Sequence, residues 1–141
     1  MPTDIRLNPL DLAKDRAIGI DLPIFGDYGS VIKLNYTTLD QAAANAKNLL
    51  LTNHGERVML PLFGCNLYKS LFENKTTLLT DTVKTTIEDQ FEYWLPYIFI
   101  NDLQVITDQD SNKLFVSITI SLKNNQFDTR SIQLEITRST I

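Results

Sequence analysis

The chain contains few residues that could carry out nucleophilic or metal chemistry. Its one histidine, His54, stands in the turn-forming segment Asn53-His54-Gly55, and its one cysteine is Cys65. A nucleophilic site needs a base beside the nucleophile and a third group that orients the base, and no such partner lies near His54 in the sequence. We therefore predict that His54 is a solvent-exposed turn residue. One cysteine forms no internal disulfide, and one Cys with one His is too small a set for a zinc site.

Carboxylates are the remaining candidates for catalysis, because two of them facing one cleft suffice to hydrolyse a glycosidic bond. Asp81 is explained by the favourable position of an acidic residue at a helix N-terminus. Glu88, Asp89 and Glu92 fall outside the apolar stripe of the same predicted helix, so they are expected on its solvated face. Glu73 is the fifth candidate. We predict no catalytic residue, no cofactor and no bound metal, and therefore a protein that is not an enzyme.

Length and charge limit the class of protein and the kinds of partner. The 141 residues, of which 43% are hydrophobic, fit one globular domain. The net charge of -4 leaves no basic surface to neutralise a phosphate backbone, so nucleic acid is not an expected partner. No stretch approaches the roughly 20 apolar residues that cross a bilayer, and charged residues occupy the N-terminus where a signal peptide is apolar. We expect a soluble protein that is made in a cytoplasm and binds no membrane.

Two helices are indicated before residue 96. Thr38 and Asp40 provide helix-start chemistry ahead of an alanine- and leucine-rich segment, which predicts a helix from about Leu39 to Leu51. A longer helix is predicted with Thr80 as its N-cap and Pro96 as its end, because proline cannot continue a helix. Its apolar stripe has a residue at every fourth position: Leu79, Val83, Ile87, Phe91 and Leu95.

The segment between the helices is expected to be irregular. Glu56 to Leu60 is predicted to run extended as far as Pro61. Gly64 is expected in a tight loop with a positive φ, and Asn66 is expected to cap a short helical stretch from Leu67 to Phe72.

Beyond Pro96 the hydrophobic pattern changes from helical to alternating. One strand is predicted by the alternation of Leu114, Val116, Ile118, Ile120 and Leu122 with more polar neighbours. Flanking strands are predicted from Ile100 to Thr107 and from Thr129 to Thr137, with turns at 108–112 and 124–128. The expected fold class is α+β, with an N-terminal arm and helices packed on a C-terminal three-stranded antiparallel sheet. Residues 1–37, with the apolar run Ile18 to Phe25, are expected to form an extended arm, and residues 38–141 a single α+β domain.

The segment from Gly55 onward carries a more specific pattern. Gly-Glu-Arg is followed by Pro-x-Phe-Gly, then by a leucine and a Leu-Phe-Glu triplet. The residues concerned are Gly55, Glu56, Arg57, Pro61, Phe63, Gly64, Leu67, Leu71, Phe72 and Glu73. With the order of helices before meander, the pattern resembles the small baseplate wedge subunit of contractile-tail, T4-like phages. That family is related to the type VI secretion baseplate protein TssE and is sometimes labelled phage lysozyme.

The resemblance implies a structural subunit of the inner baseplate ring in the virion tail, assembled in the cytoplasm of the host bacterium. It implies contacts with other wedge proteins and with the tail sheath protein, and makes hub or tube-initiating proteins further candidates. Sheath assembly would be templated when a sheath arm adds a strand to an exposed sheet edge. Thr119 and Leu134 are the residues expected on the sheath-facing strands.

The end of the long helix is the partner-binding corner that the resemblance implies. The family commonly has Glu-Pro-Arg there, where it contacts wedge partners. This chain has Leu95, Pro96 and Tyr97, so the helix break is kept and both charges are lost. A more apolar corner formed by these residues and Trp94 is expected to bind wedge partners. From the residues alone, core packing fits Trp94 and Tyr97 as well as an interface does.

Two other functions stay open at this point. A type VI secretion baseplate subunit would share the fold and the mechanism, and only the source particle or the genomic neighbours would separate it from a phage protein. A tail-associated peptidoglycan hydrolase needs two carboxylates that face one cleft, whereas a scaffold protein predicts dispersed carboxylates.

Overall fold

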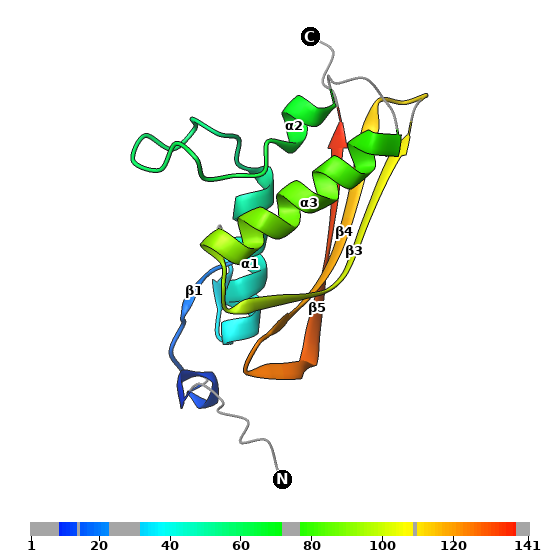
Figure 1. The fold of residues 1–141 in the computed structure, drawn as a ribbon. Coiled ribbons are helices and arrows are strands. Elements are labelled where there is room, and N and C mark those ends of the chain that lie inside the picture. Colours follow the sequence, from blue (N-terminus) through cyan, green and yellow to red (C-terminus); the bar gives the residue numbers. More distant parts are fainter. Residues whose placement is uncertain (1–8, 14, 23–31, 72–76, 109, 138–141) are drawn as a thin grey trace.

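The computed structural model in Figure 1 has two long helices on one face of a three-stranded antiparallel sheet, which confirms the predicted α+β class. The structure describes residues 9–13, 15–22, 32–71, 77–108 and 110–137. Its elements are η1 (Pro9–Leu12), β1 (Gly19–Ile20), β2 (Leu34–Asn35), α1 (Thr38–Leu51), α2 (Leu67–Ser70), α3 (Thr77–Trp94), β3 (Ile98–Asp108), β4 (Lys113–Leu122) and β5 (Asn125–Thr137).

The C-terminal meander has the strand order β3-β4-β5. The predicted alternation holds along β4, since Leu114, Val116, Ile118 and Ile120 are all buried against the helices. Ser121 breaks the pattern, because it is fully buried although it belongs to the opposite set. The turn between β4 and β5 is tighter than predicted, since β5 already begins at Asn125. The pairing then shifts between Ser121 and Leu122, which leaves residues 126–128 without a partner on β4.

The core lies between the helices and the sheet. The predicted stripe of α3, from Leu79 to Leu95, is buried throughout. The helix begins at Thr77, however, so Thr80 lies inside its first turn and is not the N-cap. Its last residue is Trp94, two before Pro96, as expected of a residue that cannot continue a helix.

Helix α1 occupies the predicted range and begins one residue earlier than expected. Thr37 is the N-cap, and its hydroxyl oxygen accepts a hydrogen bond from the amide of Asp40 at 3.2 Å. The amide of Thr38 is satisfied by a residue of η1, because it donates to Asp11 Oδ1 at 2.8 Å. This bond, together with the contacts of β1 and β2 with α1, joins the segment before residue 37 to the helix. Pro23 to Phe25, the end of the predicted apolar run, lie outside the described residues.

The connection between α1 and α2 differs from the prediction. Glu56 to Leu60 forms turns and bends and is not extended. Gly64 has the predicted positive φ, at 121°. Asn66 precedes α2 in a left-handed conformation and makes no side-chain cap, because its Oδ1 accepts a hydrogen bond from the amide of His54 instead. The short helix ends at Ser70, and Phe72 lies outside the described residues.

Candidate assembly interface

The predicted partner-binding residues lie together at the corner after α3, but they differ in how far they are exposed to solvent. Leu95 is only 7% exposed and belongs to the core, so its side chain cannot meet a partner. Pro96 is exposed, and Tyr97 is 40% exposed. The hydroxyl of Tyr97 accepts a hydrogen bond from Asn45 Nδ2 on α1 at 2.9 Å, so this ring is anchored to its own chain and still presents a face to solvent.

Trp94 connects the corner to the loop between α1 and α2. Its ring meets Phe63 edge-on with centroids 5.3 Å apart, and it meets Tyr93 in the same manner at 4.9 Å. On the far side of Phe63, the guanidinium of Arg57 lies 4.1 Å from the ring centroid. Such edge-on and cation–π contacts favour a fixed arrangement of the rings. The corner and the loop therefore form one connected surface.

The family-like motif builds the loop of residues 52–66. Glu56 accepts hydrogen bonds from the amide and the side chain of Asn53, at 3.0 and 2.8 Å, and these bonds lower the pKa of Glu56. The amide of Gly55 donates to the carbonyl of Pro61 at 2.8 Å, which closes the loop. Phe63 and Gly64 are buried at its base.

The motif continues beyond the loop. Leu67 is fully buried and Leu71 packs against the core, while Phe72 and Glu73 lie outside the described residues. His54 is exposed in its turn, as predicted, and its Nε2 lies 2.8 Å from the carbonyl oxygen of Gly64.

The loop also displays residues that the sequence analysis did not select. Its tip exposes four large apolar side chains, Val58, Met59, Leu60 and Leu62. The signal was present in the sequence, because a run of apolar residues between Gly55 and Pro61 fits an exposed turn better than a buried strand once Gly and Pro close it at both ends. Because Glu56 to Leu60 was predicted to be extended, these side chains were not selected as an exposed surface.

Only one of the two predicted sheath-facing residues lies at a sheet edge. Thr119 is on β4, the central strand, where its neighbours are Asp102 on β3 and Ser131 on β5. Its backbone therefore has no room for an added strand. Leu134 lies on β5, and the outer edges of β3 and β5 pair with no other strand in the described part of the chain.

The described carboxylates among the catalytic candidates all lie on α3, and none of them lines the hollow between η1 and the β4–β5 turn. Asp81, Glu88, Asp89 and Glu92 are all exposed along α3, and Glu73 lies outside the described residues. Among the residues that the structure describes, no group of three or more His, Cys, Asp or Glu side chains could hold a metal ion. Burial raises the pKa of the Cys65 thiol to about 12, so this side chain behaves as an apolar core residue.

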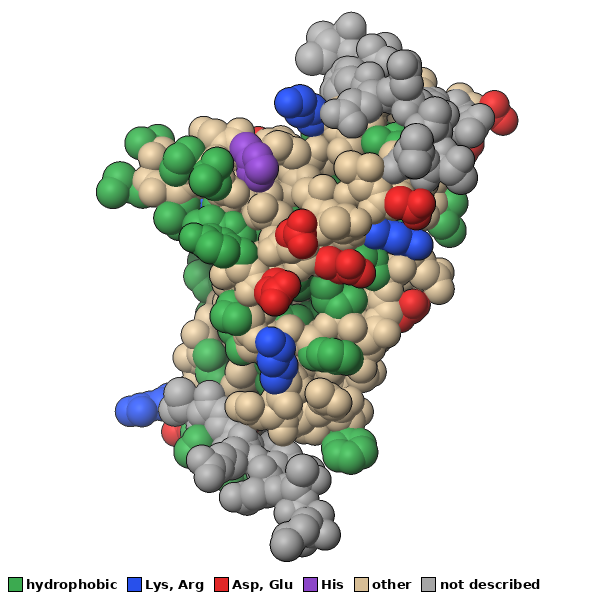
Figure 2. All heavy atoms as spheres, viewed as in Figure 1, with side chains coloured by type: hydrophobic (Ala, Val, Ile, Leu, Met, Phe, Trp, Pro, Cys, Tyr) green, Lys and Arg blue, Asp and Glu red, His purple; other side chains and the backbone are tan. Residues whose placement is uncertain are grey.

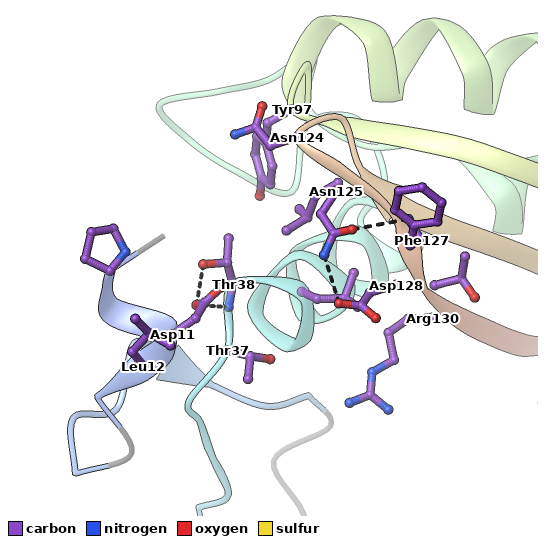
Figure 3. A pocket seen from close by; sticks show the side chains of 14 residues that line it. Asp11, Leu12, Thr37, Thr38, Tyr97, Asn124, Asn125, Phe127, Asp128 and Arg130 are labelled. Atoms are coloured by element: carbon purple, nitrogen blue, oxygen red, sulfur yellow. Dashed lines mark hydrogen bonds between the residues drawn. The ribbon is translucent and has the colours of Figure 1, made fainter. Parts of the chain in front are cut away.

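A hollow of about 870 Å³ lies between η1, the start of α1 and the β4–β5 turn (Figure 3). Two carboxylates line it, Asp11 and Asp128. Asp11 is occupied by Thr38, whose amide and hydroxyl both donate to it, and Asp128 accepts a hydrogen bond from Asn125 at 2.9 Å. Both carboxylates thus serve local structure.

No helix within the described ranges is long and apolar enough to span a membrane.

Comparison with known proteins decides the family. A model described as baseplate wedge protein gp25 matches residues 39–126, which cover α1, the loop, α3 and most of the sheet. The chain belongs to the baseplate wedge protein gp25 family. The gp25 protein of Enterobacteria phage T4 is 36% identical over 91 residues, which cover 64% of this chain and 69% of the T4 protein. Family membership supports a structural role in a phage baseplate.

Solved structures show the same fold at lower identity. A Geobacter sulfurreducens protein described as a tail lysozyme has a TM-score of 0.60 and 19% identity, covering 71% of this chain and 90% of its own. A chain of the anti-feeding prophage baseplate has a TM-score of 0.60 and 23% identity, covering 76% and 86% respectively. These likenesses show that the chain shares its fold with both proteins.

Proposed function

We propose that this protein is a non-enzymatic structural subunit of a contractile-tail phage baseplate wedge. It joins other wedge proteins and templates the tail sheath, and it is assembled into the tail in the host cytoplasm. The observation that carries the proposal is the gp25 family match, which spans both long helices and most of the sheet. The α3 carboxylates are exposed and do not line the hollow of Figure 3, which agrees with a scaffold role, because hydrolysis needs two of them in one cleft.

Sheath templating has physical support in the open edge of β5. This strand spans Asn125–Thr137 and pairs on one side only, with β4. An edge of this length presents unpaired amide and carbonyl groups to an arriving strand, which gains main-chain hydrogen bonds when it adds to the sheet. Leu134 is half-buried, so an added strand would also meet a part-apolar edge.

The connection to wedge partners has its support in the α3 corner. Exposed Pro96 and Tyr97 stand beside Trp94, which is half-buried over the core. Aromatic side chains that are anchored and still partly exposed are frequent energetic centres of protein interfaces. A wedge protein that covers Tyr97 would bury apolar area without reordering the ring, because Asn45 already holds its hydroxyl.

Proline substitutions on β5 test the templating role. Amide directions alternate along an edge strand, so one of Gln133 and Leu134 points its N–H away from β4. Proline at that position removes a donor for the added strand and leaves the β4–β5 ladder in place. We expect one of Gln133→Pro and Leu134→Pro to fold, to enter the baseplate and to stop sheath growth, as seen in electron micrographs of tails.

Two outcomes would reject the proposal. Absence of the chain from purified tails would exclude the baseplate role itself. Normal sheath growth on baseplates that contain folded Gln133→Pro and folded Leu134→Pro protein would exclude the β5 edge as the template.

A further inference from the structure

The tip of the loop between α1 and α2 is an apolar protrusion, here called the 58–62 knob and formed by Val58, Met59, Leu60 and Leu62. Val58 is 93% exposed, Met59 88% and Leu62 70%. Figure 2 shows hydrophobic side chains gathered along this loop and beside the C-terminal end of α3. Leu60 is 40% exposed, so the other three side chains form most of the exposed apolar surface of the knob. A contiguous patch of exposed large apolar side chains is uncommon on an isolated protein and often marks an interaction site.

The knob is held in one conformation by hydrogen bonds within the loop. Leu60 donates its amide to the Arg57 carbonyl at 3.2 Å, and Phe63 donates to the Leu60 carbonyl at 3.1 Å. At the base, Cys65 donates its amide to the carbonyl of Thr52, also at 3.2 Å. The apolar tip is therefore presented by a folded support, so a partner that buries it has less backbone conformational entropy to remove than it would from an unstructured loop.

A continuous set of side chains connects the knob to the end of α3. Arg57 stacks on Phe63, Phe63 meets Trp94, and Trp94 meets Tyr93, which is itself 75% exposed. The knob and Tyr93 thus flank one ring cluster. A protein that binds this side of the molecule can cover both.

The charged side chains at the C-terminal end of α3 are all acidic, and the cation nearest to them along this surface is Arg57, which is stacked on Phe63. Glu88, Asp89 and Glu92 are exposed on the last two turns of α3, and residues 85–97 contain no Lys or Arg. None of the three carboxylates makes an ion pair with another residue in the part of the chain that the structure describes. Figure 2 shows acidic side chains over α3 next to the hydrophobic patch.

We propose that the 58–62 knob inserts into an apolar groove of another baseplate protein, and that Lys or Arg side chains on the rim of this groove meet the carboxylates of α3. The proposal rests on the baseplate role and adds a second contact beside the Tyr97 corner, together with the chemistry of the partner. Exposed apolar side chains supply the affinity, and the acidic rim orients the approach.

A second copy of this chain does not fit the same surface. The protein carries a net charge of -4, and an isologous dimer would bring two acidic α3 faces toward each other. Like charges at an interface disfavour association. The groove must therefore belong to a different protein, with basic residues where this chain has acidic ones.

Met59 provides a direct probe, because the chain contains only one other methionine, at position 1. Exposed methionine is oxidised to the sulfoxide by dilute hydrogen peroxide, and burial protects it. The experiment compares Met59 oxidation in the free chain and in purified tails by peptide mass spectrometry. We expect rapid oxidation in the free chain, unchanged by protein concentration, and several-fold slower oxidation in tails.

The outcomes separate this inference from the baseplate role. Equal oxidation of Met59 in free chain and in tails that contain the protein overturns the knob contact and leaves the baseplate role intact. Protection that appears in the free chain as its concentration rises, together with dimers in sedimentation, overturns the proposed partner in favour of a second copy. Absence of the chain from tails refutes the baseplate role first.

Substitutions test the apolar and the charged parts of the surface separately. Met59→Asp places a charge on the knob and should lower incorporation into tails by about tenfold, whereas Met59→Leu keeps an apolar side chain and should incorporate normally. Glu92→Lys should weaken incorporation, and Asp81→Lys, an equal charge change at the other end of α3, should not. Normal incorporation of folded Met59→Asp protein rejects the knob, and equal effects of the two lysine variants reject the basic rim.

Discussion

At the scale of single residues, two glycines determine whether the loop between α1 and α2 can close. Gly64 has a φ of 121°, and a Cβ added to it would lie 2.2 Å from the carbonyl oxygen of Thr52. Gly55 has a φ of 86° but no neighbouring atom within 4 Å of an added Cβ. The two positions share an unusual backbone conformation, and only one of them also has a close approach to another backbone segment.

Gly64→Ala is expected to destabilise the protein far more than Gly55→Ala. The first variant combines backbone strain with a clash against a fixed backbone atom, and should lose roughly 2 to 4 kcal/mol. The second suffers backbone strain alone and should lose about 1 kcal/mol. Urea unfolding of both variants and the wild type measures the difference. Equal losses would contradict a role for the contact between Gly64 and Thr52.

The stability of the same loop is expected to depend on pH through the carboxylate of Glu56. Hydrogen bonds from the amide and then the side chain of Asn53 favour the ionised carboxylate and lower the pKa of Glu56 below its ordinary value of 4.5. A group whose pKa is lower in the folded state contributes stability above its ordinary pKa, and this contribution is lost as the pH falls through the folded-state pKa. The loop is therefore expected to keep its bonds at neutral pH and to loosen only in acid.

The Asn53 amide reports this titration in NMR spectra. Its chemical shift should change with a midpoint below 4.5 in the wild type, because the amide bonds to the Glu56 carboxylate. In Glu56→Gln protein the step should disappear, while amides of the sheet stay unchanged. A midpoint at or above 4.5 would show that the Asn53 bonds do not favour the ionised form.

At the scale of elements, the beginning of α1 is stabilised by two residues from different segments. The hydroxyl of Thr37 caps the amide of Asp40, and Asp11 of η1 accepts from the next residue, Thr38. The unpaired amides at a helix start need acceptors, and here a local side chain and one 27 positions earlier share the task. The segment before residue 37 is thereby attached to the helix through its cap.

Thr37→Ala is expected to lower the free energy of unfolding by about 1 kcal/mol, the usual loss for a helix N-cap. Thr37→Ser keeps the hydroxyl and should lose only a few tenths of that value. Thermal or urea unfolding distinguishes the two variants. If Thr37→Ser were as unstable as Thr37→Ala, the methyl group and not the cap would be responsible.

Hydrophobic patterning predicted the elements of this fold well, because burial repeats with the period of each element. The stripe from Leu79 to Leu95 and the alternation from Leu114 to Ile120 are both buried as expected. Helix starts were less certain, since neighbouring threonines offer similar caps: Thr37 was chosen over Thr38, and α3 begins before Thr80. Such competition is decided by contacts from distant segments, as with Asp11 and Thr38.

The site was harder to predict than the fold. Alternation along a strand shows which side chains share a face, but it does not show which strand lies in the middle, and Thr119 proved to be central. The spacing of Leu95 makes it a core residue, although the resemblance to a charged corner suggested an interface. The knob was missed because Glu56 to Leu60 was predicted to be extended, although the glycine and the proline at the ends of this segment favour a turn.

At the scale of the whole molecule, the helices cover one face of the sheet, while the outer edges of β3 and β5 pair with no other strand in the described part of the chain (Figure 1). Exposed aromatic and apolar side chains occur at Phe99, Ile106 and Phe115 on the opposite face. The knob and the Tyr97 corner lie beside the C-terminal end of α3. A small protein with separate surfaces of this kind is suited to hold several neighbours at once.

The tail-lysozyme description of one structural neighbour raises the question of cell-wall hydrolysis, and the carboxylates argue against it. A general acid for glycoside cleavage needs a raised pKa. A second hollow, of about 740 Å³, is lined by Asp21, by Asp40 and by residues of β2 and β5. Asp21 shows the reverse of a raised pKa: burial alone would raise its pKa, but the hydrogen bonds from Lys33 and the Leu22 amide outweigh burial and lower it. Asp40, in the same hollow, forms an ion pair with Arg130.

We therefore expect the purified protein to release no soluble fragments from peptidoglycan, even at concentrations far above those at which a muramidase used as a positive control is active. The remaining pair that lines one hollow, Asp11 and Asp128, accepts hydrogen bonds from Thr38 and Asn125, so both carboxylates already have structural partners within the chain. Turbidity of a peptidoglycan suspension and analysis of released reducing sugars measure the activity.

Hydrolysis that disappears in Glu73→Gln, Glu88→Gln, Asp11→Asn or Asp128→Asn protein would identify a catalytic carboxylate and overturn the proposal of a non-enzymatic role. Loss of activity in none of these variants would instead indicate a co-purifying enzyme, which a second purification step would remove.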